Sequence, residues 1–327
     1  MRNRLGRLSS VLTIGALVPV VAIGIGAAHG AKSHAHIEPR VPVTASDSTT
    51  RVQMQNVDFY VDPHVVLRIR HLSGSMRSKI GGPVMFDDRN SFAFNVDNAE
   101  VGLTGSDLAA LMNNHVFNYA GSPLSHLSIT IANGEIVQKG TLRKIASMPF
   151  TIHAAISATP EGEIRIHPTK TEILGIHVDK LMRGLGLPLG KVINLSKAKG
   201  ASIRGNDIYL QPGEILPPPE IDGHVSSVAV EGDQVVMHFG STSSRPAMIV
   251  PMSAEKNYMY YRGGTLRFGK MMMLDADMML TDMNPADPFQ FDLDRYKPQL
   301  VAGYSRTLQS GALVVWMRDI DRLNSSR

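Results

Sequence analysis

Apolar and polar side chains alternate with a period of two through most of the chain after residue 64. The clearest example is residues 127–131, which are followed by Asn133-Gly134 and a second alternating run at 135–138. Asn-Gly favours a two-residue hairpin turn because both positions need a positive φ. A second hairpin is predicted to reverse at 160–162, and the strands expected from the pattern lie at 65–70, 127–131, 135–138, 150–156, 163–167, 207–210, 225–230 and 234–239. Successive hairpins form an antiparallel meander, so we expect an α+β, β-rich fold.

Two short segments show a helical period instead. The first covers 106–117, with Ser106 as the predicted N-cap, and its apolar stripe consists of Leu108, Leu111, Met112, His115 and Val116. The second covers 178–185, where Leu181, Met182 and Leu185 face one way. Such a stripe most often covers the core face of a sheet, but it can also line a groove, and the sequence leaves both roles open.

Residues 241–327 differ in composition and are expected to form a β-rich C-terminal segment, either a separate layer or a subdomain. Methionines are concentrated at 271–280, and a last strand is predicted at 312–317. Methionine is unbranched and adapts to irregular partners, so these side chains either fill gaps in a core or form a surface for flexible acyl chains.

The N-terminus has the features of an export signal. Arg2, Arg4 and Arg7 precede an uncharged run from residue 8 to 28, and Ala28-His29-Gly30 offers small residues for a signal peptidase. The run is 21 residues long, which is also enough to span a bilayer as a helix. Residues 1–30 are therefore a cleaved signal peptide or an N-terminal membrane anchor. Residues 31–50, rich in Ser, Thr and Pro, are expected to be a flexible tether, and the rest of the chain to lie in the periplasm or outside the cytoplasm.

Charge and cysteine content narrow the function classes. The chain has 33 basic and 29 acidic side chains and a net charge of +4, but residues 1–30 contribute three arginines and no acid, so the remainder carries only +1. Lysines and arginines are interspersed with acids, which argues against a nucleic-acid partner. The chain has no cysteine, which excludes disulfides, thiol chemistry and cysteine-ligated zinc.

No motif nominates a metal, cofactor or catalytic site. His34 and His36 form an isolated pair, and six aspartates between 275 and 294 do not follow the spacing of a calcium-binding EF-hand loop. Asn284-Pro285 and Asp287-Pro288 indicate turns. The sequence has no G-x-S-x-G, H-E-x-x-H or phosphate-loop motif, and 222–224 is interpreted as a turn. We therefore expect no metal, no cofactor and no enzyme, although a triad assembled from distant residues stays open.

Residues 97–239 resemble LmeA-like bacterial proteins of the tubular lipid-binding (TULIP) superfamily. The resemblance consists of a succession of patterns: a helix at 106–117, P-L-x-x-L-x-I-x-I-x-N-G-x-I from 123, M-P-F-x-I from 148, T-P-E-G-E-I-R-I at 159–166, G-I-x-V-x-x-L-M-x-x-L-G-L at 175–187 and G-N-D-I-Y-L at 205–210. It implies a curved antiparallel sheet wrapped around a helix, with an apolar groove for lipid tails. The segment after residue 240 departs from this pattern.

The resemblance implies a lipid-binding β-rich domain over 51–240, and alternating strands partly covered by helices are compatible with a cleft for acyl chains. The candidate groove residues are Leu108, Leu111, Met112, Ile129, Ile131, Ile152, Ile156, Leu181 and Met182. The expected function is lipid binding or transfer in the cell envelope, with a phospholipid or other envelope lipid and the membrane surface as partners. The alternative is a non-enzymatic envelope scaffold that binds a protein partner, and an envelope hydrolase is a third class.

Overall fold

The protein is described from a computed structural model, and the description covers residues 49–143, 147–173, 176–177, 193–240 and 247–324. The chain divides into two compact units, Met1–Val43 and Thr44–Arg327, and everything below concerns the second unit. The expected leader, the tether up to residue 48 and the helix predicted at 178–185 lie outside the described residues. The last two residues of the expected tether, Thr49 and Thr50, already belong to the first strand.

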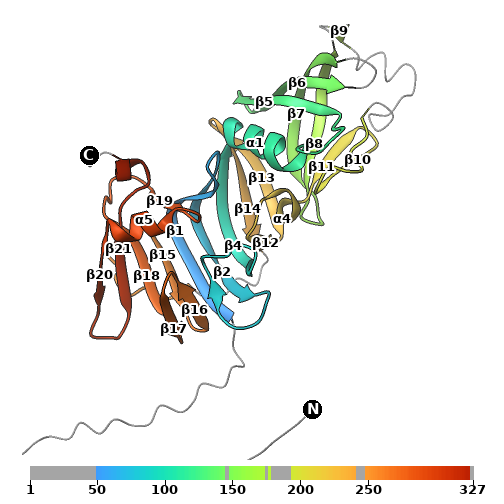
Figure 1. Cartoon of the computed structure of the whole chain (residues 1–327). Coiled ribbons are helices and arrows are strands. Elements are labelled where there is room, and N and C mark those ends of the chain that lie inside the picture. Colours follow the sequence, from blue (N-terminus) through green and yellow to red (C-terminus); the bar gives the residue numbers. More distant parts are fainter. Residues whose placement is uncertain (1–48, 144–146, 174–175, 178–192, 241–246, 325–327) are drawn as a thin grey trace, which may run out of the picture. The chain divides into compact units, whose positions relative to one another are not determined.

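The larger of three sheets has eleven strands and is mostly antiparallel (Figure 1). Its main path runs in the order β13 (Val225–Glu231), β14 (Gln234–Gly240), β4 (Phe92–Thr104), β2 (Val65–Ser78), β1 (Thr49–Asp62), β15 (Tyr258–Arg262), β18 (Asp277–Asp282), β21 (Leu313–Met317) and β20 (Tyr304–Thr307). Two short strands pair beside this path in parallel, β12 (Glu220–Asp222) with β4 and β19 (Phe289–Asp292) with β1. The C-terminal segment thus continues the sheet that β1, β2 and β4 begin.

In the two longest strands the alternation of buried and exposed side chains shifts by one residue at one paired position. In β1 the buried residues are Val52 and Met54 before Asn56, then Val57 and Phe59 after it, and Asn56 has a φ of 50°. Positive φ is tolerated by asparagine and breaks the strict alternation of a strand. The neighbouring strand β2 changes phase near Arg70. The alternation predicted a strand that ends at residue 70 because the pattern shifts there, but the strand continues to residue 78.

A second sheet of seven strands is antiparallel throughout. Its order is β10 (Ala201–Arg204), β11 (Asp207–Leu210), β8 (Ile164–Ile173), β7 (Ser147–Ala158), β6 (Glu135–Arg143) and β5 (Leu124–Ala132), with β9 (Ile176–His177) beside β8. The predicted hairpin turn is confirmed, because Asn133 and Gly134 have φ values of 55° and 77°. The expected α+β, β-rich fold built on antiparallel sheets is confirmed.

A third sheet of three strands consists of β17 (Met271–Leu274), β16 (Thr265–Phe268) and β3 (Val84–Met85). Phe86, directly after β3, joins this sheet to the larger one. It is 1% exposed and its ring lies 5.3–6.3 Å, centroid to centroid, from those of Phe92, Tyr261, Phe268, Phe291 and Tyr296. These rings come from five different elements, so one aromatic cluster holds the C-terminal strands to the N-terminal ones.

Helices are few and short among the described residues. They are α1 (Gly105–Leu111), which continues into the π-helical turn η1 (Met112–Val116), then α4 (Pro212–Ile215), α5 (Tyr296–Val301) and the 3-10 turn η2 (Asp321–Asn324). The predicted N-cap of α1 at Ser106 is wrong. Thr104 caps the helix and forms a capping box with Asp107, in which each side chain bonds the other residue's backbone N–H.

Candidate functional site

An apolar cavity of about 70 Å³ lies where the second sheet, α1 and α4 approach β4 and β14. We call it the seam cavity. Among the described residues that line it, Gln138 is the only polar one, and the full lining is Leu103, Leu108, Leu111, Met112, Ile129, Ile136, Gln138, Ala154, Ile156, Ile164, Ile166, Leu210, Pro212, Ile215, Leu216, Val235 and Met237. Figure 1 shows α1 and α4 at this junction, between β13 and β14 on one side and the second sheet on the other.

A smaller apolar cavity of about 40 Å³ lies against the larger sheet. We call it the sheet cavity, and all of its described lining residues are apolar, including Phe59, Phe94 and Phe239. Leu216 and Met237 line both cavities. The two spaces are therefore neighbours that share part of their lining, and one of the shared side chains, that of Met237, is unbranched and flexible.

Helix α1 is fixed over the seam cavity by Asp107, which is 4% exposed. Its Oδ1 accepts a hydrogen bond from the Val66 backbone N–H at 3.1 Å, and its Oδ2 accepts from the Thr104 N–H at 2.8 Å and pairs with Arg68. One carboxylate thus joins β2, the end of β4 and α1. The anchored helix directs Leu108 and Leu111 into the cavity lining.

The continuation of α1 is held to the second sheet by an amide clamp. The Asn113 Nδ2 donates to the Leu127 carbonyl at 2.8 Å, and the Asn113 Oδ1 accepts from the Leu127 N–H at 3.0 Å. The clamp uses backbone groups that a bulge next to His126, whose φ is 53°, leaves out of the β5–β6 ladder. The seam cavity is therefore bordered by a helix that both sheets hold in place.

Of the candidate groove residues, five line the seam cavity, namely Leu108, Leu111, Met112, Ile129 and Ile156. Ile152 packs in the main core and Ile131 packs in a small cluster with Ile136 and Val235, and neither is among the described residues that line the two cavities. Leu181 and Met182 lie outside the described residues. Sequence reasoning missed Leu216 and Met237, the two residues that line both cavities. Met237 lies on a predicted strand, so its alternation could have indicated that it faces inward. Leu216 lies beside the prolines 217–219, where no periodic pattern indicates its role.

Imidazole–carboxylate pairs occur on the surface of the second sheet. His153 Nδ1 lies 2.9 Å from Glu135 Oε2, and this hydrogen bond lowers the pKa of Glu135. Burial opposes it, but hydrogen bonds from His167 and Arg165 lower the pKa of Asp207. Within the described part of the chain, no serine or threonine hydroxyl bonds a histidine ring nitrogen, so the described residues do not complete a hydrolytic triad at these pairs.

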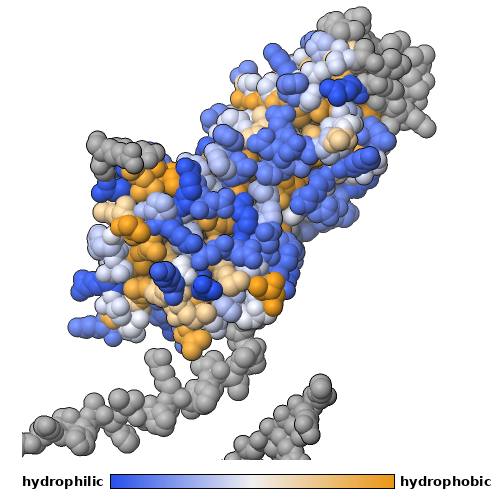
Figure 2. Space-filling model, viewed as in Figure 1, coloured by the Kyte–Doolittle hydropathy of each residue, from blue (hydrophilic) through white to orange (hydrophobic). Residues whose placement is uncertain are grey.

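An exposed apolar edge is formed by β17, the outer strand of the three-stranded sheet. Met271, Met272 and Leu274 are 37%, 52% and 68% exposed, and Figure 2 shows hydrophobic side chains at the surface in this region. Leu274 pairs with Thr265, directly after a turn whose Gly264 packs against the backbone of Thr49. The Leu274 end of this apolar edge therefore lies beside the start of β1.

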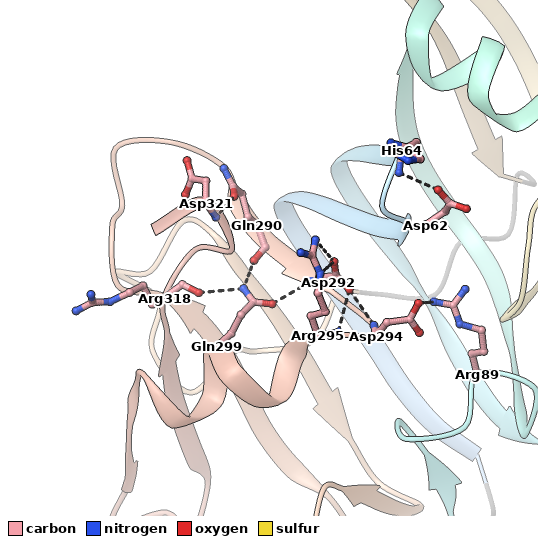
Figure 3. A network of polar contacts seen from close by, with 10 residues as sticks. All are labelled: Asp62, His64, Arg89, Gln290, Asp292, Asp294, Arg295, Gln299, Arg318 and Asp321. Atoms are coloured by element: carbon pink, nitrogen blue, oxygen red, sulfur yellow. Dashed lines mark hydrogen bonds and ion pairs between the residues drawn. The ribbon is translucent and has the colours of Figure 1, made fainter. Parts of the chain in front are cut away.

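A buried glutamine on α5 connects strand β19 with the segment that follows β21. Gln299 on α5 is fully buried; its Oε1 accepts from the Asp292 N–H at 3.0 Å, and its Nε2 donates to the carbonyls of Gln290 and Arg318. Figure 3 shows this amide at the centre of a polar network that continues through Asp292 to Arg295. The network fixes β19 against the segment that follows β21.

Comparison of the chain with protein-family models, curated proteins and solved structures finds no match. None of the helices in the described ranges has the length and apolar character needed to cross a bilayer.

Proposed function

We propose that this protein is exported to the cell envelope and binds the acyl part of a phospholipid or other envelope lipid in the seam cavity. The observation that carries the proposal is the lining itself, which is apolar at every described position except Gln138. Burial of a methylene group contributes about 0.8 kcal/mol to the free energy of binding, so a chain of several methylenes can bind here without a charged side chain that recognises the headgroup. The arginine-rich, apolar N-terminus supports export.

The present size of the cavities sets a condition on binding. The seam cavity has about 70 Å³ and the sheet cavity about 40 Å³, whereas an apolar cavity of roughly 150 Å³ is needed for a molecule such as benzene. An acyl chain therefore enters by displacing Leu216 and Met237, which merges the two spaces. Methionine changes rotamer at little cost, and this supports such an opening.

The exposed edge of β17 supports contact with a bilayer surface. Leu274, at one end of this edge, lies beside the start of β1, and Met271 and Met272 extend the apolar surface along β17. Transfer of partly exposed apolar side chains from water into the interface of a bilayer is favourable. In this arrangement the membrane is both the source of the lipid and the surface on which the unit rests.

The test is native mass spectrometry with lipid extraction on residues 44–327, exported behind a cleavable leader and purified without detergent. We expect a co-purifying lipid near unit stoichiometry. Ile156→Trp places a larger side chain in the seam cavity and should abolish the lipid signal. Ile203→Trp is the matched control, because Ile203 is also half-buried in the second sheet but lines neither cavity.

A gain-of-function variant makes the test two-sided. Met237→Ala removes a side chain that both cavities share, so it should raise the affinity for an added fluorescent fatty acid and lower the stability of the lipid-free protein. A folded protein that carries no lipid, takes up none when phospholipid is added and shows no response to these variants would refute lipid binding. A stoichiometric protein partner in the same preparation would then favour the envelope scaffold.

A further inference from the structure

Three aspartates meet at the ends of two parallel strands in the C-terminal part. Asp282 is the last residue of β18, Asp319 follows the end of β21, and Asp287 lies in the loop between β18 and β19. Strands β18 and β21 pair in parallel with Asp282 opposite Met317, so their carboxyl ends share one edge. One carboxylate oxygen from each aspartate lies within 4.8 Å of the other two. We call this group the Asp282 cluster.

Two of the three carboxylates are buried with one oxygen left without a donor. Asp282 is 3% exposed and Asp319 is 1% exposed. In each, Oδ1 accepts a backbone N–H, from Asn284 at 2.8 Å and from Gln290 at 3.2 Å. The Oδ2 atoms of both residues are buried and accept no hydrogen bond. A buried carboxylate oxygen in this state costs free energy unless a cation compensates it.

Among the described residues, one guanidinium forms ion pairs with this group. The guanidinium of Arg322, half exposed, lies 3.9 Å from Asp319 Oδ2 and 3.3 Å from Asp287 Oδ2. The amide of Asn257 donates to the backbone carbonyl of Asp287, and its hydrogen bonding also acts to lower the pKa of Asp282. Three carboxylates therefore face one another with one guanidinium at the rim.

Burial and mutual repulsion act on the protonation of the pair. Desolvation, reinforced by Asp319 and Asp287, raises the pKa of Asp282 to about 7. Desolvation also raises the pKa of Asp319 to about 6, with Asp287 and Asp321 adding to the rise and Arg322 opposing it.

We propose that Asp282, Asp287 and Asp319 bind a calcium ion. Oxygen-only ligands select a hard cation such as Ca²⁺ or Mg²⁺ rather than zinc. Ca–O distances of about 2.3–2.6 Å allow ligand oxygens on opposite sides of the ion to lie about 4.6–5.2 Å apart, which accommodates the observed span. Mg–O distances of about 2.0–2.1 Å would require a smaller group. Asp287 is partly exposed, so water completes the coordination from that side.

The proposal departs from the sequence-based expectation of no metal site and does not depend on lipid binding. The bound ion would fix the ends of β18 and β21 and the loop that leads into β19. Because β19 pairs with β1, the site would tie the C-terminal strands to the start of the larger sheet. The aspartate run 275–294 contributes two ligands, and the third comes from a later segment.

The experiment is isothermal titration of the chelator-treated full chain with calcium, paired with thermal unfolding in calcium or magnesium at equal concentration. We expect a calcium Kd on the order of 10⁻⁴–10⁻³ M, in the range of extracellular calcium modules, and a larger rise of Tm in calcium than in magnesium. Asp282→Asn and Asp319→Asn should each lower the calcium affinity by about tenfold or more, because the ligand charge decreases.

Asp321→Asn is the matched control, since this carboxylate is exposed, lies near the group and is not one of the three ligands. It should keep the calcium response. Asp287→Asn covers the case in which the buried variants do not fold, because its side chain is partly exposed. The absence of calcium binding at about 5 mM, well above the expected Kd, or an equal calcium response in the three ligand variants and the native chain, overturns the proposal.

Discussion

Replacement of Asp107 by alanine tests whether one buried carboxylate holds α1 against both the larger sheet and the seam cavity. The substitution removes the acceptor of the Val66 and Thr104 backbone N–H groups and the partner of Arg68. It also removes half of the capping box at the start of α1. The three effects act on β2, on the end of β4 and on the helix that carries Leu108.

The size of the effect follows from burial on the two sides of the ion pair. Removing one partner of a buried ion pair costs about 3–5 kcal/mol. The side chain of Asp107 is 6% exposed but that of Arg68 is 30% exposed, so the guanidinium regains part of its hydration and the cost is lower. The lost N-cap contributes about 1 kcal/mol of the total. We expect Asp107→Ala to lower the free energy of unfolding by about 3 kcal/mol, which corresponds to a fall in Tm of roughly 6–10 °C.

The assay is urea and thermal unfolding of three variants, monitored by circular dichroism. Thr104→Ala should cost about 1 kcal/mol as the loss of the cap alone. Ser106→Ala should cost less than about 0.5 kcal/mol, because the Ser106 hydroxyl is exposed and contacts only that of Thr104. A loss in Ser106→Ala as large as that in Asp107→Ala would refute this account of the helix start, as would an unchanged stability in Asp107→Ala.

Three further outcomes follow from the structure. With chelator present, the free energy of unfolding should fall as pH rises from about 5 to 8. The folded-state pKa values of Asp282 and Asp319 are raised, so their stabilisation is complete below the unfolded pKa near 4 and is lost through pH 6–7. In a pH series of thermal melts, the variant with both aspartates changed to Asn should lose this pH dependence. Gly105→Ala should cost about 1–3 kcal/mol in urea unfolding, since an added Cβ would lie 2.3 Å from the Ile129 carbonyl oxygen, and an unchanged midpoint would contradict that contact. Gln299→Leu should lower the free energy of unfolding by about 3 kcal/mol, because three backbone groups around the fully buried Gln299 amide lose their partner. A loss below about 1 kcal/mol would show that water replaces the amide.

The elements that the sequence predicted well depend on local chemistry. The turn at Asn133-Gly134 is determined by two residues that accept positive φ, and the flanking strands follow from alternation alone. The start of α1 is different, because Thr104 and Ser106 are both acceptable caps in isolation. The choice between them comes from Asp107, whose carboxylate is also fixed by β2, an element distant in sequence.

Long-range pairing accounts for most of what the sequence did not reveal about the fold. The strand β1 was not predicted, because its alternation changes phase at Asn56. No periodic signal indicates that β15 pairs with β1 across about 200 residues, so the C-terminal segment was not recognised as part of the same sheet. Both features depend on partner strands rather than on the residues themselves.

The same distinction applies to the candidate sites. Alternation and helical spacing were sufficient to nominate Leu108, Ile129 and Ile156, because inward-facing positions of neighbouring elements line the same space. They could not nominate Leu216, which follows no period. The Asp282 cluster was equally inaccessible, because its geometry depends on the parallel pairing of β18 with β21, which brings Asp319 to a loop that precedes it by more than 30 residues.

The two proposed sites use different parts of the chain, which makes them separately testable. The described residues that line the seam and sheet cavities all fall between 54 and 239, whereas the three aspartates lie between 282 and 319. Substitutions at sites without shared partners usually act independently. Asp319→Asn should therefore abolish the calcium response and leave lipid stoichiometry unchanged, and Ile156→Trp should do the reverse. Loss of lipid on removal of calcium would instead indicate that β1, which pairs with β19 and forms part of the sheet cavity, couples the two sites.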